Sequence, residues 1–123
     1  MGKYVVKNTK TGIKFDLKAG NGEIIANSEV YKKKASCLNG IKSVMKNAPI
    51  AALEDQTVEE FEKCKCPKFE VYVDKAGEFR FRLKARNGEI IATGEGYKAR
   101  KSCLNGIESI RKNADSPIVF AEE

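Results

Sequence analysis

The sequence predicts an α+β protein built from two copies of one small unit that share a core. Residues 18–48 are identical to residues 84–114 at 21 of 31 aligned positions, with an offset of 66. Each copy has stretches of alternating apolar and polar residues, typical of half-buried strands, followed by apolar residues at helical spacing. A unit this small cannot bury its own apolar face, so the duplication indicates one shared core.

The first part of each copy is predicted to form three antiparallel strands. Strict alternation marks strands at residues 13–17, 69–73 and 79–83, and residues 4–7 form a weaker counterpart of 69–73. The pairs Asn21-Gly22 and Asn87-Gly88 predict two-residue type I′ hairpin turns, in which both central residues have positive φ. The strand after each turn closes the three-stranded set.

A helix follows the strands in each copy. Its apolar positions are Cys37, Leu38, Ile41 and Val44 in the first copy and Cys103, Leu104, Ile107 and Ile110 in the second. Asn47 and Asn113 are expected to end the helices, since a proline lies just beyond each. The apolar stretches 50–53 and 118–120 then predict a last strand in each copy.

An acidic connector separates the copies. The motif Thr57-Val58-Glu59-Glu60 is a capping-box signature and predicts a short helix there. We therefore divide one domain, residues 1–123, into a first repeat at 1–53, a connector at 54–67 and a second repeat at 68–120.

The repeated motifs resemble the YegP-like family of small bacterial and archaeal proteins. The motifs are Phe-x-Phe or Lys-Phe, Leu-Lys-Ala, Asn-Gly-Glu-x-Ile, Tyr-Lys and Ser-x-x-x-Gly-Ile, each present in both copies. The resemblance implies two β-β-β-α-β units that share a single antiparallel sheet, exchange their C-terminal strands and pack both helices on one face. It implies no particular activity.

Composition excludes several functional classes. The chain has no His, so it cannot form a Ser–His or Cys–His pair or a histidine metal site. It has no Trp and four Tyr, which leaves little for base stacking. The carboxylates form no catalytic pair, so we expect no enzymatic activity and no cofactor. Without a signal-like or membrane-spanning apolar run, we expect a cytoplasmic protein with reduced thiols and no membrane contact.

The four cysteines are expected to be structural. Cys64 and Cys66 are spaced one residue closer than the usual zinc knuckle, and nothing in the spacing brings Cys37 and Cys103 to them. A redox dithiol at Cys64 and Cys66 is the functional alternative.

A stripe of small residues recurs in both predicted helices. Its central members are Gly40 and Gly106, flanked by serines and asparagines at helical spacing. A glycine inside a helix costs about 1 kcal/mol relative to alanine, so we expect both glycines to mark close packing. A ligand lying against the bare helix backbone is the alternative.

Basic residues gather before each helix and on one face of the predicted sheet. The candidate anion-binding residues are Lys32, Lys33, Lys34, Lys98, Arg100 and Lys101. If Leu17 pairs with Ala26 and Lys18 with Ile25, the sheet face opposite the core offers further contacts. These candidates are Lys18, Ile25, Tyr72, Arg80, Arg82, Lys84 and Ile91. Solvated surface charge is the simpler interpretation of both groups.

The charge distribution favours an anionic partner. The net charge is +6, but residues 1–48 hold 10 basic and 3 acidic residues, and residues 68–114 hold 11 and 6. Residues 49–67 and 115–123 are acidic. We therefore expect a small non-enzymatic binding module, a monomer or weak homodimer, whose basic surface meets an anionic partner such as nucleic acid. The alternative is a structural or protein-interaction module that uses the exposed sheet face or its edges.

Overall fold

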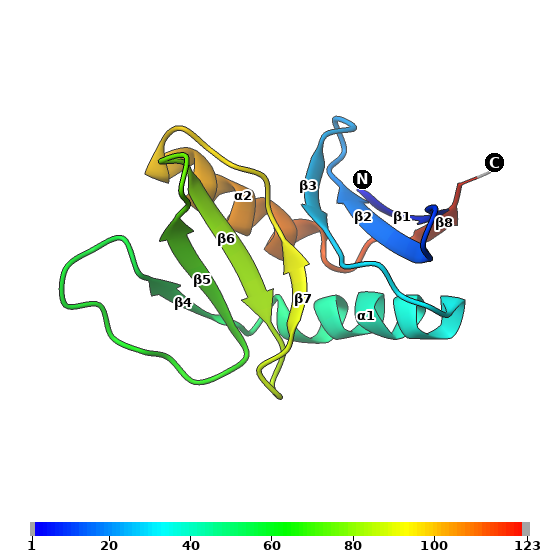
Figure 1. The fold of residues 1–123 in the computed structure, drawn as a ribbon, viewed down its shortest axis with the longest axis horizontal. Helices are drawn as coiled ribbons and strands as arrows, with labels where there is room; N and C mark the ends of the chain where they lie inside the picture. Colours follow the sequence, from blue (N-terminus) through cyan, green and yellow to red (C-terminus); the bar gives the residue numbers. More distant parts are fainter. Residues whose placement is uncertain (1, 122–123) are drawn as a thin grey trace.

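The computed structural model describes residues 2–121, which form two helices and one eight-stranded sheet (Figure 1). The elements in chain order are β1 (Lys3–Asn8), β2 (Ile13–Lys18), β3 (Ile24–Asn27), α1 (Lys34–Asn47), β4 (Ala52–Asp55), β5 (Lys68–Val73), β6 (Phe79–Lys84), β7 (Ile90–Thr93), α2 (Arg100–Asn113) and β8 (Ile118–Phe120). The α+β class, the duplication and the helix ends at Asn47 and Asn113 are as predicted.

The sheet is mixed, which corrects the expectation of a wholly antiparallel one. Its strand order is β4-β5-β6-β7-β3-β2-β1-β8. The two outermost pairs, β1 with β8 and β4 with β5, are parallel, and the others are antiparallel. The last strand of each repeat therefore extends the sheet of the other repeat.

Both helices lie on one face of the sheet. At the centre of the sheet β3 pairs with β7 through Asn27 and Thr93. The side chains of these two residues hydrogen-bond at 3.1 Å, so both point to the same face of the sheet. The opposite face carries buried Phe15 in β2 and Phe81 in β6, and these approach Gly40 of α1 and Gly106 of α2 respectively. Each helix also packs over the third strand of the other repeat, α1 on β7 and α2 on β3. The halves are thus joined by the helices and the exchanged strands.

The hairpin turns differ from the predicted type I′. In the first hairpin Ala19 N–H donates to the Glu23 carbonyl and Gly22 N–H to the Ala19 carbonyl, so the loop between Ala19 and Glu23 has three residues. Only Gly22 has positive φ, at 87°, while Asn21 does not. This is a type I turn closed by a glycine bulge, and the second hairpin repeats it at Gly88.

A second irregularity, a register shift between Leu17 and Lys18 and again between Leu83 and Lys84, moves two predicted contact residues off the open face. Leu17 pairs with Ala26 as expected, but Lys18 pairs with Ile24 rather than Ile25. Ile25 and its equivalent Ile91 are 6% and 7% exposed and belong to the helix-side core. The prediction that they lie on the open face is wrong, because one extra residue in the strand redirects the side chains that follow.

The connector forms turns rather than the predicted helix. The Thr57 hydroxyl and amide both bond to the carboxylate of Asp55, two residues back, so Thr57 does not cap a following turn of helix. β4 runs to Asp55, two residues beyond the predicted end of the first repeat.

Candidate functional site

The predicted cations of the open sheet face are mostly held in ion pairs. The Glu70 carboxylate lies 2.6 Å from Arg82 Nε, 3.1 Å from Lys68 Nζ and 3.2 Å from Lys84 Nζ. Burial alone would raise the pKa of Glu70, but hydrogen bonds from Arg82, Lys68 and Lys84 lower it below its usual value. Arg80 likewise bonds the Asp74 carboxylate. These cations neutralise internal carboxylates and offer little free charge to a ligand.

The other open-face candidates do not combine into a binding surface. The Arg82 guanidinium stacks 4.7 Å from the centre of the Tyr72 ring, which covers that aromatic face. Within residues 2–121, Lys18 has no ion-pair partner, but Ile25 and Ile91 are buried on the other side. Lys18 is thus left as an isolated cation.

The basic clusters before the two helices lie at opposite edges of the sheet. Lys34 at the start of α1 sits beside β8, with its ammonium 4.2 Å from the centre of the Phe120 ring. Arg100 at the start of α2 sits beside β4, where its Nε lies 2.6 Å from the Asp55 carboxylate. Figure 1 shows α1 beginning near β8 and α2 beginning far from it. The structure therefore does not unite Lys32, Lys33 and Lys34 with Lys98, Arg100 and Lys101.

A groove runs along α1, between that helix and the β6–β7 hairpin of the other repeat. It consists of two adjoining cavities of about 370 and 200 Å³ that share Asn39, Ser43, Ala85 and Asn87. We call it the α1 groove. Its other lining residues are Tyr31, Ser36, Gly40, Lys42, Lys46, Asn47, Arg86, Glu89 and Ile91.

The α1 groove is rich in hydrogen-bond donors and positive charge. Lys42, Lys46 and Arg86 line one part, and no carboxylate among residues 2–121 pairs with them. Asn47 is already engaged, since its amide donates to the Ser43 carbonyl at 2.8 Å. The other part holds Tyr31, whose pKa is raised by burial and by nearby acidic groups including Glu89, so its hydroxyl stays protonated. Such a lining suits an anion flanked by groups that hydrogen-bond.

The equivalent region of α2 is different, although the fold repeats. Glu108 stands where α1 has Lys42, and Gly20 stands where the facing hairpin has Arg86. In addition, Gly2 is packed tightly between the Asn113 side chain and the Lys18 carbonyl. Two of the three cations that line the α1 groove, Lys42 and Arg86, therefore have no basic equivalent beside α2.

Gly40 and Gly106 make room for tyrosine side chains. A Cβ at Gly40 would overlap the Tyr31 hydroxyl, and one at Gly106 would lie 2.6 Å from the Tyr97 hydroxyl. The packing interpretation thus has a defined partner, a tyrosine from the loop before each helix, rather than helix against helix. Gly40 also lines the α1 groove.

The cysteines fall into two classes. Cys37 and Cys103 are buried, and burial raises the pKa of both thiols, that of Cys103 to about 11. Cys64 and Cys66 are partly exposed in the connector. Among residues 2–121 no group of cysteine and carboxylate side chains is arranged to hold a metal ion.

Alkylation should separate these classes. With iodoacetamide at about pH 8, we expect two modified thiols in the folded protein, at Cys64 and Cys66, and four after denaturation, because only accessible thiolates react. Intact mass and peptide mapping give the sites. Equally fast modification of Cys103 in the folded state would contradict the assignment.

The repeated sequence motifs do not indicate Lys42, Lys46 and Arg86. One signal was available, since the 14 residues of α1 include no acidic residue. The groove can be identified only once the fold is known, because Arg86 and Asn87 come from the repeat that does not contain α1.

No helix within residues 2–121 has the length and apolarity needed to cross a membrane.

Comparisons with known proteins agree with the duplication. The chain is 40% identical to a UPF0339 protein of Acinetobacter baylyi, over 96% of this chain and 94% of the relative, and 37% identical to the UPF0339 protein YegP of Yersinia pestis, over 97% and 94%. A UPF0339 protein of Treponema denticola is 62% identical over 52 residues, which is 42% of this chain and 90% of that protein.

Solved structures extend the likeness to the fold. The solution structure of a UPF0339 protein from Shewanella oneidensis matches with a TM-score of 0.79 at 34% identity, over 97% of this chain and 90% of that one. That of yegP from E. coli, described as a protein of unknown function, matches with a TM-score of 0.78 at 29% identity, over 99% and 96%. The model of the family described as "Domain of unknown function (DUF1508)" matches twice, at residues 9–55 and 74–119, and the chain belongs to that family.

Proposed function

We propose that the protein is a non-enzymatic binding module that holds the phosphate backbone of nucleic acid along the α1 groove. The observation that carries this proposal is the concentration of unpaired cations on one side of a donor-rich groove. Among residues 2–121, Lys42, Lys46 and Arg86 have no carboxylate partner, whereas the open-face cations Arg80, Arg82 and Lys84 do.

The groove chemistry matches a phosphodiester better than a lone small anion. Two adjoining cavities provide room for more than one phosphate, and Asn39 and Asn87 line both cavities. Amide and hydroxyl donors contact phosphate oxygens and sugars without reading sequence. Lys32 and Lys33, which are exposed and follow the groove residue Tyr31, add positive charge before α1. The proposal therefore predicts binding with little sequence preference.

A matched pair of charge reversals tests the site. Lys46→Glu and Lys112→Glu change the net charge equally and occupy equivalent positions in the two repeats. We expect Lys46→Glu to weaken binding of a fluorescent single-stranded oligonucleotide strongly and Lys112→Glu to weaken it little, as measured by anisotropy at low salt.

The salt dependence gives an independent measure. Replacing Lys42, Lys46 and Arg86 together by Gln should reduce the slope of log affinity against log salt by about 2 for a single strand, because about three fewer counterions are released. Equal effects of Lys46→Glu and Lys112→Glu would show general charge attraction and would refute the groove as the site.

A further inference from the structure

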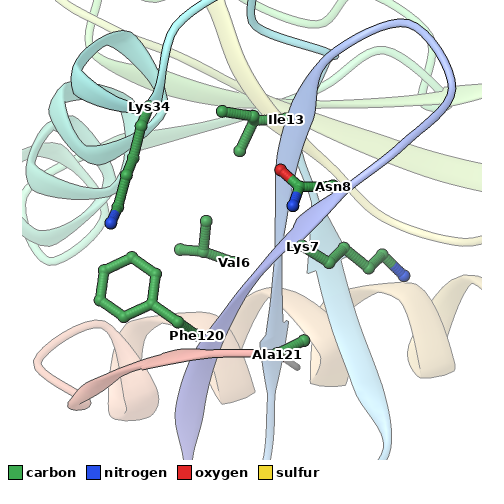
Figure 2. A pocket seen from close by; sticks show the side chains of 7 residues that line it. All are labelled: Val6, Lys7, Asn8, Ile13, Lys34, Phe120 and Ala121. Atoms are coloured by element: carbon green, nitrogen blue, oxygen red, sulfur yellow. The ribbon is translucent and has the colours of Figure 1, made fainter. Parts of the chain in front are cut away.

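The cavity at the β8 edge, of about 180 Å³, has cations that are already engaged within the chain. Figure 2 shows Lys34 and Phe120 beside this cavity, and the Lys34 ammonium lies 4.2 Å from the centre of the Phe120 ring. Lys7 points away from both, and its ammonium lies 2.7 Å from the Asp16 carboxylate. The free charge of the described cavities is therefore concentrated in the α1 groove.

The α1 groove separates its charges by sign. The larger cavity holds the three cations Lys42, Lys46 and Arg86, and the smaller one holds the carboxylate of Glu89. Among residues 2–121 no cation lies within ion-pair distance of the Glu89 carboxylate. A phosphate is attracted to the first part of the groove and repelled by the second. The two parts therefore suit different groups of one ligand.

The smaller cavity combines this carboxylate acceptor with several hydrogen-bond donors. The Asn87 side-chain oxygen accepts from the Glu89 amide at 3.0 Å, which leaves the Asn87 NH₂ group free to donate. The Ser43 hydroxyl accepts from the Asn47 amide at 3.0 Å and can itself donate. The Tyr31 hydroxyl keeps its proton, because burial and nearby acidic groups including Glu89 raise its pKa. A neutral group that both donates and accepts fits this lining.

We propose, on the basis of the proposed function, that the nucleic acid in the α1 groove is RNA and that the Glu89 carboxylate accepts a hydrogen bond from a ribose 2′-hydroxyl. The sugar is the group next to each phosphate. Since the two cavities adjoin and share Asn39 and Asn87, a phosphate in the larger cavity brings its sugar to the smaller one. The 2′-hydroxyl both donates and accepts, and DNA lacks it. Carboxylates bind ribose hydroxyls in the same way in dinucleotide-binding folds.

A base is a poorer occupant of the smaller cavity. Of the residues that line it, Tyr31 alone is aromatic, and its hydroxyl end lies against Gly40 of α1. Recognition of single-stranded bases relies on stacking against aromatic side chains. We therefore expect a preference for RNA that does not depend on sequence.

The region beside α2 supplies an internal control. Tyr97 and Glu23 occupy the positions equivalent to Tyr31 and Glu89. Burial raises the pKa of Tyr97, and acidic groups that include Glu23 raise it further, so the carboxylate and the hydroxyl are again close. Glu108 and Gly20 replace the cations Lys42 and Arg86 there. A phosphate is not held beside α2, and Glu23 has no sugar to bind.

Anisotropy titrations at low salt with single-stranded RNA and DNA of one sequence test the proposal. We expect the wild type to bind RNA about tenfold more tightly, the effect of one hydrogen bond to a charged group. The same RNA with fluorine in place of each 2′-hydroxyl cannot donate and should bind like DNA. Glu89→Gln should lower the RNA preference to about twofold, because a neutral acceptor is weaker. Glu23→Gln changes the net charge equally and should leave the preference unchanged.

The ratio of the two affinities separates the sugar contact from the phosphate site. Equal binding of RNA and DNA, both weakened by Lys46→Glu, would overturn the 2′-hydroxyl contact and leave the groove as the phosphate site. Absence of binding by either strand would overturn both. A preference for RNA that disappears with a second, unrelated sequence would assign the smaller cavity to a base, and a preference that Glu23→Gln removes would place the contact beside α2. Either result would overturn the contact at Glu89.

Discussion

Gly106→Leu is expected to destabilise the protein by about 3 kcal/mol, the upper end of the cost of overpacking a core. A Cβ there would lie 2.6 Å from the Tyr97 hydroxyl and 3.4 Å from the Phe81 ring, and the rest of a leucine must also be placed. Replacing a helical glycine would by itself gain about 1 kcal/mol, so the steric cost dominates. Urea unfolding monitored by circular dichroism measures the difference.

Two further variants identify the cause of that loss. Asn105→Leu changes the exposed neighbour on the same helix and should stay within about 0.5 kcal/mol of the wild type. The double variant Gly106→Ala with Tyr97→Phe should be more stable than Gly106→Ala alone, because Tyr97→Phe removes the hydroxyl oxygen with which the new Cβ collides. A stable Gly106→Leu variant would show that α2 does not pack closely on the tyrosine.

Much of the fold could be predicted because both copies carry the same local signals. The alternation around Phe15 and Phe81 and the asparagines that end the helices act over a few residues, and the duplication repeats them. The same locality explains the failures. The register shift that buries Ile25 depends on a three-residue loop in place of the predicted two-residue one, and the Asp55 carboxylate binds the Thr57 hydroxyl that the capping-box motif assigns to a helix cap.

The candidate site was harder to predict, because it depends on how the repeats differ rather than on what they share. Lys42 and Arg86 belong to different repeats, and each has a non-basic equivalent in the other, Glu108 and Gly20. A search for repeated features selects the helix starts at Lys34 and Arg100, which the fold places apart. Only the crossing of α1 over β7 brings the groove residues together.

The second large effect is expected from Lys68→Met, which should lower the free energy of unfolding by about 3 kcal/mol at neutral pH. Lys68 Nζ lies 2.8 Å from the Glu54 carboxylate and 3.1 Å from that of Glu70, and both carboxylates are almost fully buried. Methionine keeps the packing of the side chain but leaves Glu54 without its cation. Lys3→Met is the matched control at the equivalent position of β1, where the lysine is exposed and its removal should cost less than about 0.5 kcal/mol.

The pH dependence distinguishes a lost ion pair from lost packing. Burial tends to raise the pKa of Glu54, but hydrogen bonds from Lys68, Gln56 and the Cys64 amide outweigh it and hold the pKa at about 2, below the ordinary 4.5. A carboxyl with a lowered folded-state pKa stabilises the protein above its unfolded pKa, and this contribution is lost as the pH falls toward the folded value. The gap between wild type and Lys68→Met should therefore be widest above about pH 4.5 and narrow toward pH 2, because protonated Glu54 no longer needs the cation. Unfolding midpoints across this pH range measure the stability gap between wild type and Lys68→Met, and a gap that does not change with pH would assign the loss to packing.

Glu54 also binds the connector through the Cys64 amide. Lys68→Met should therefore speed proteolysis of the connector, whereas Lys3→Met should not.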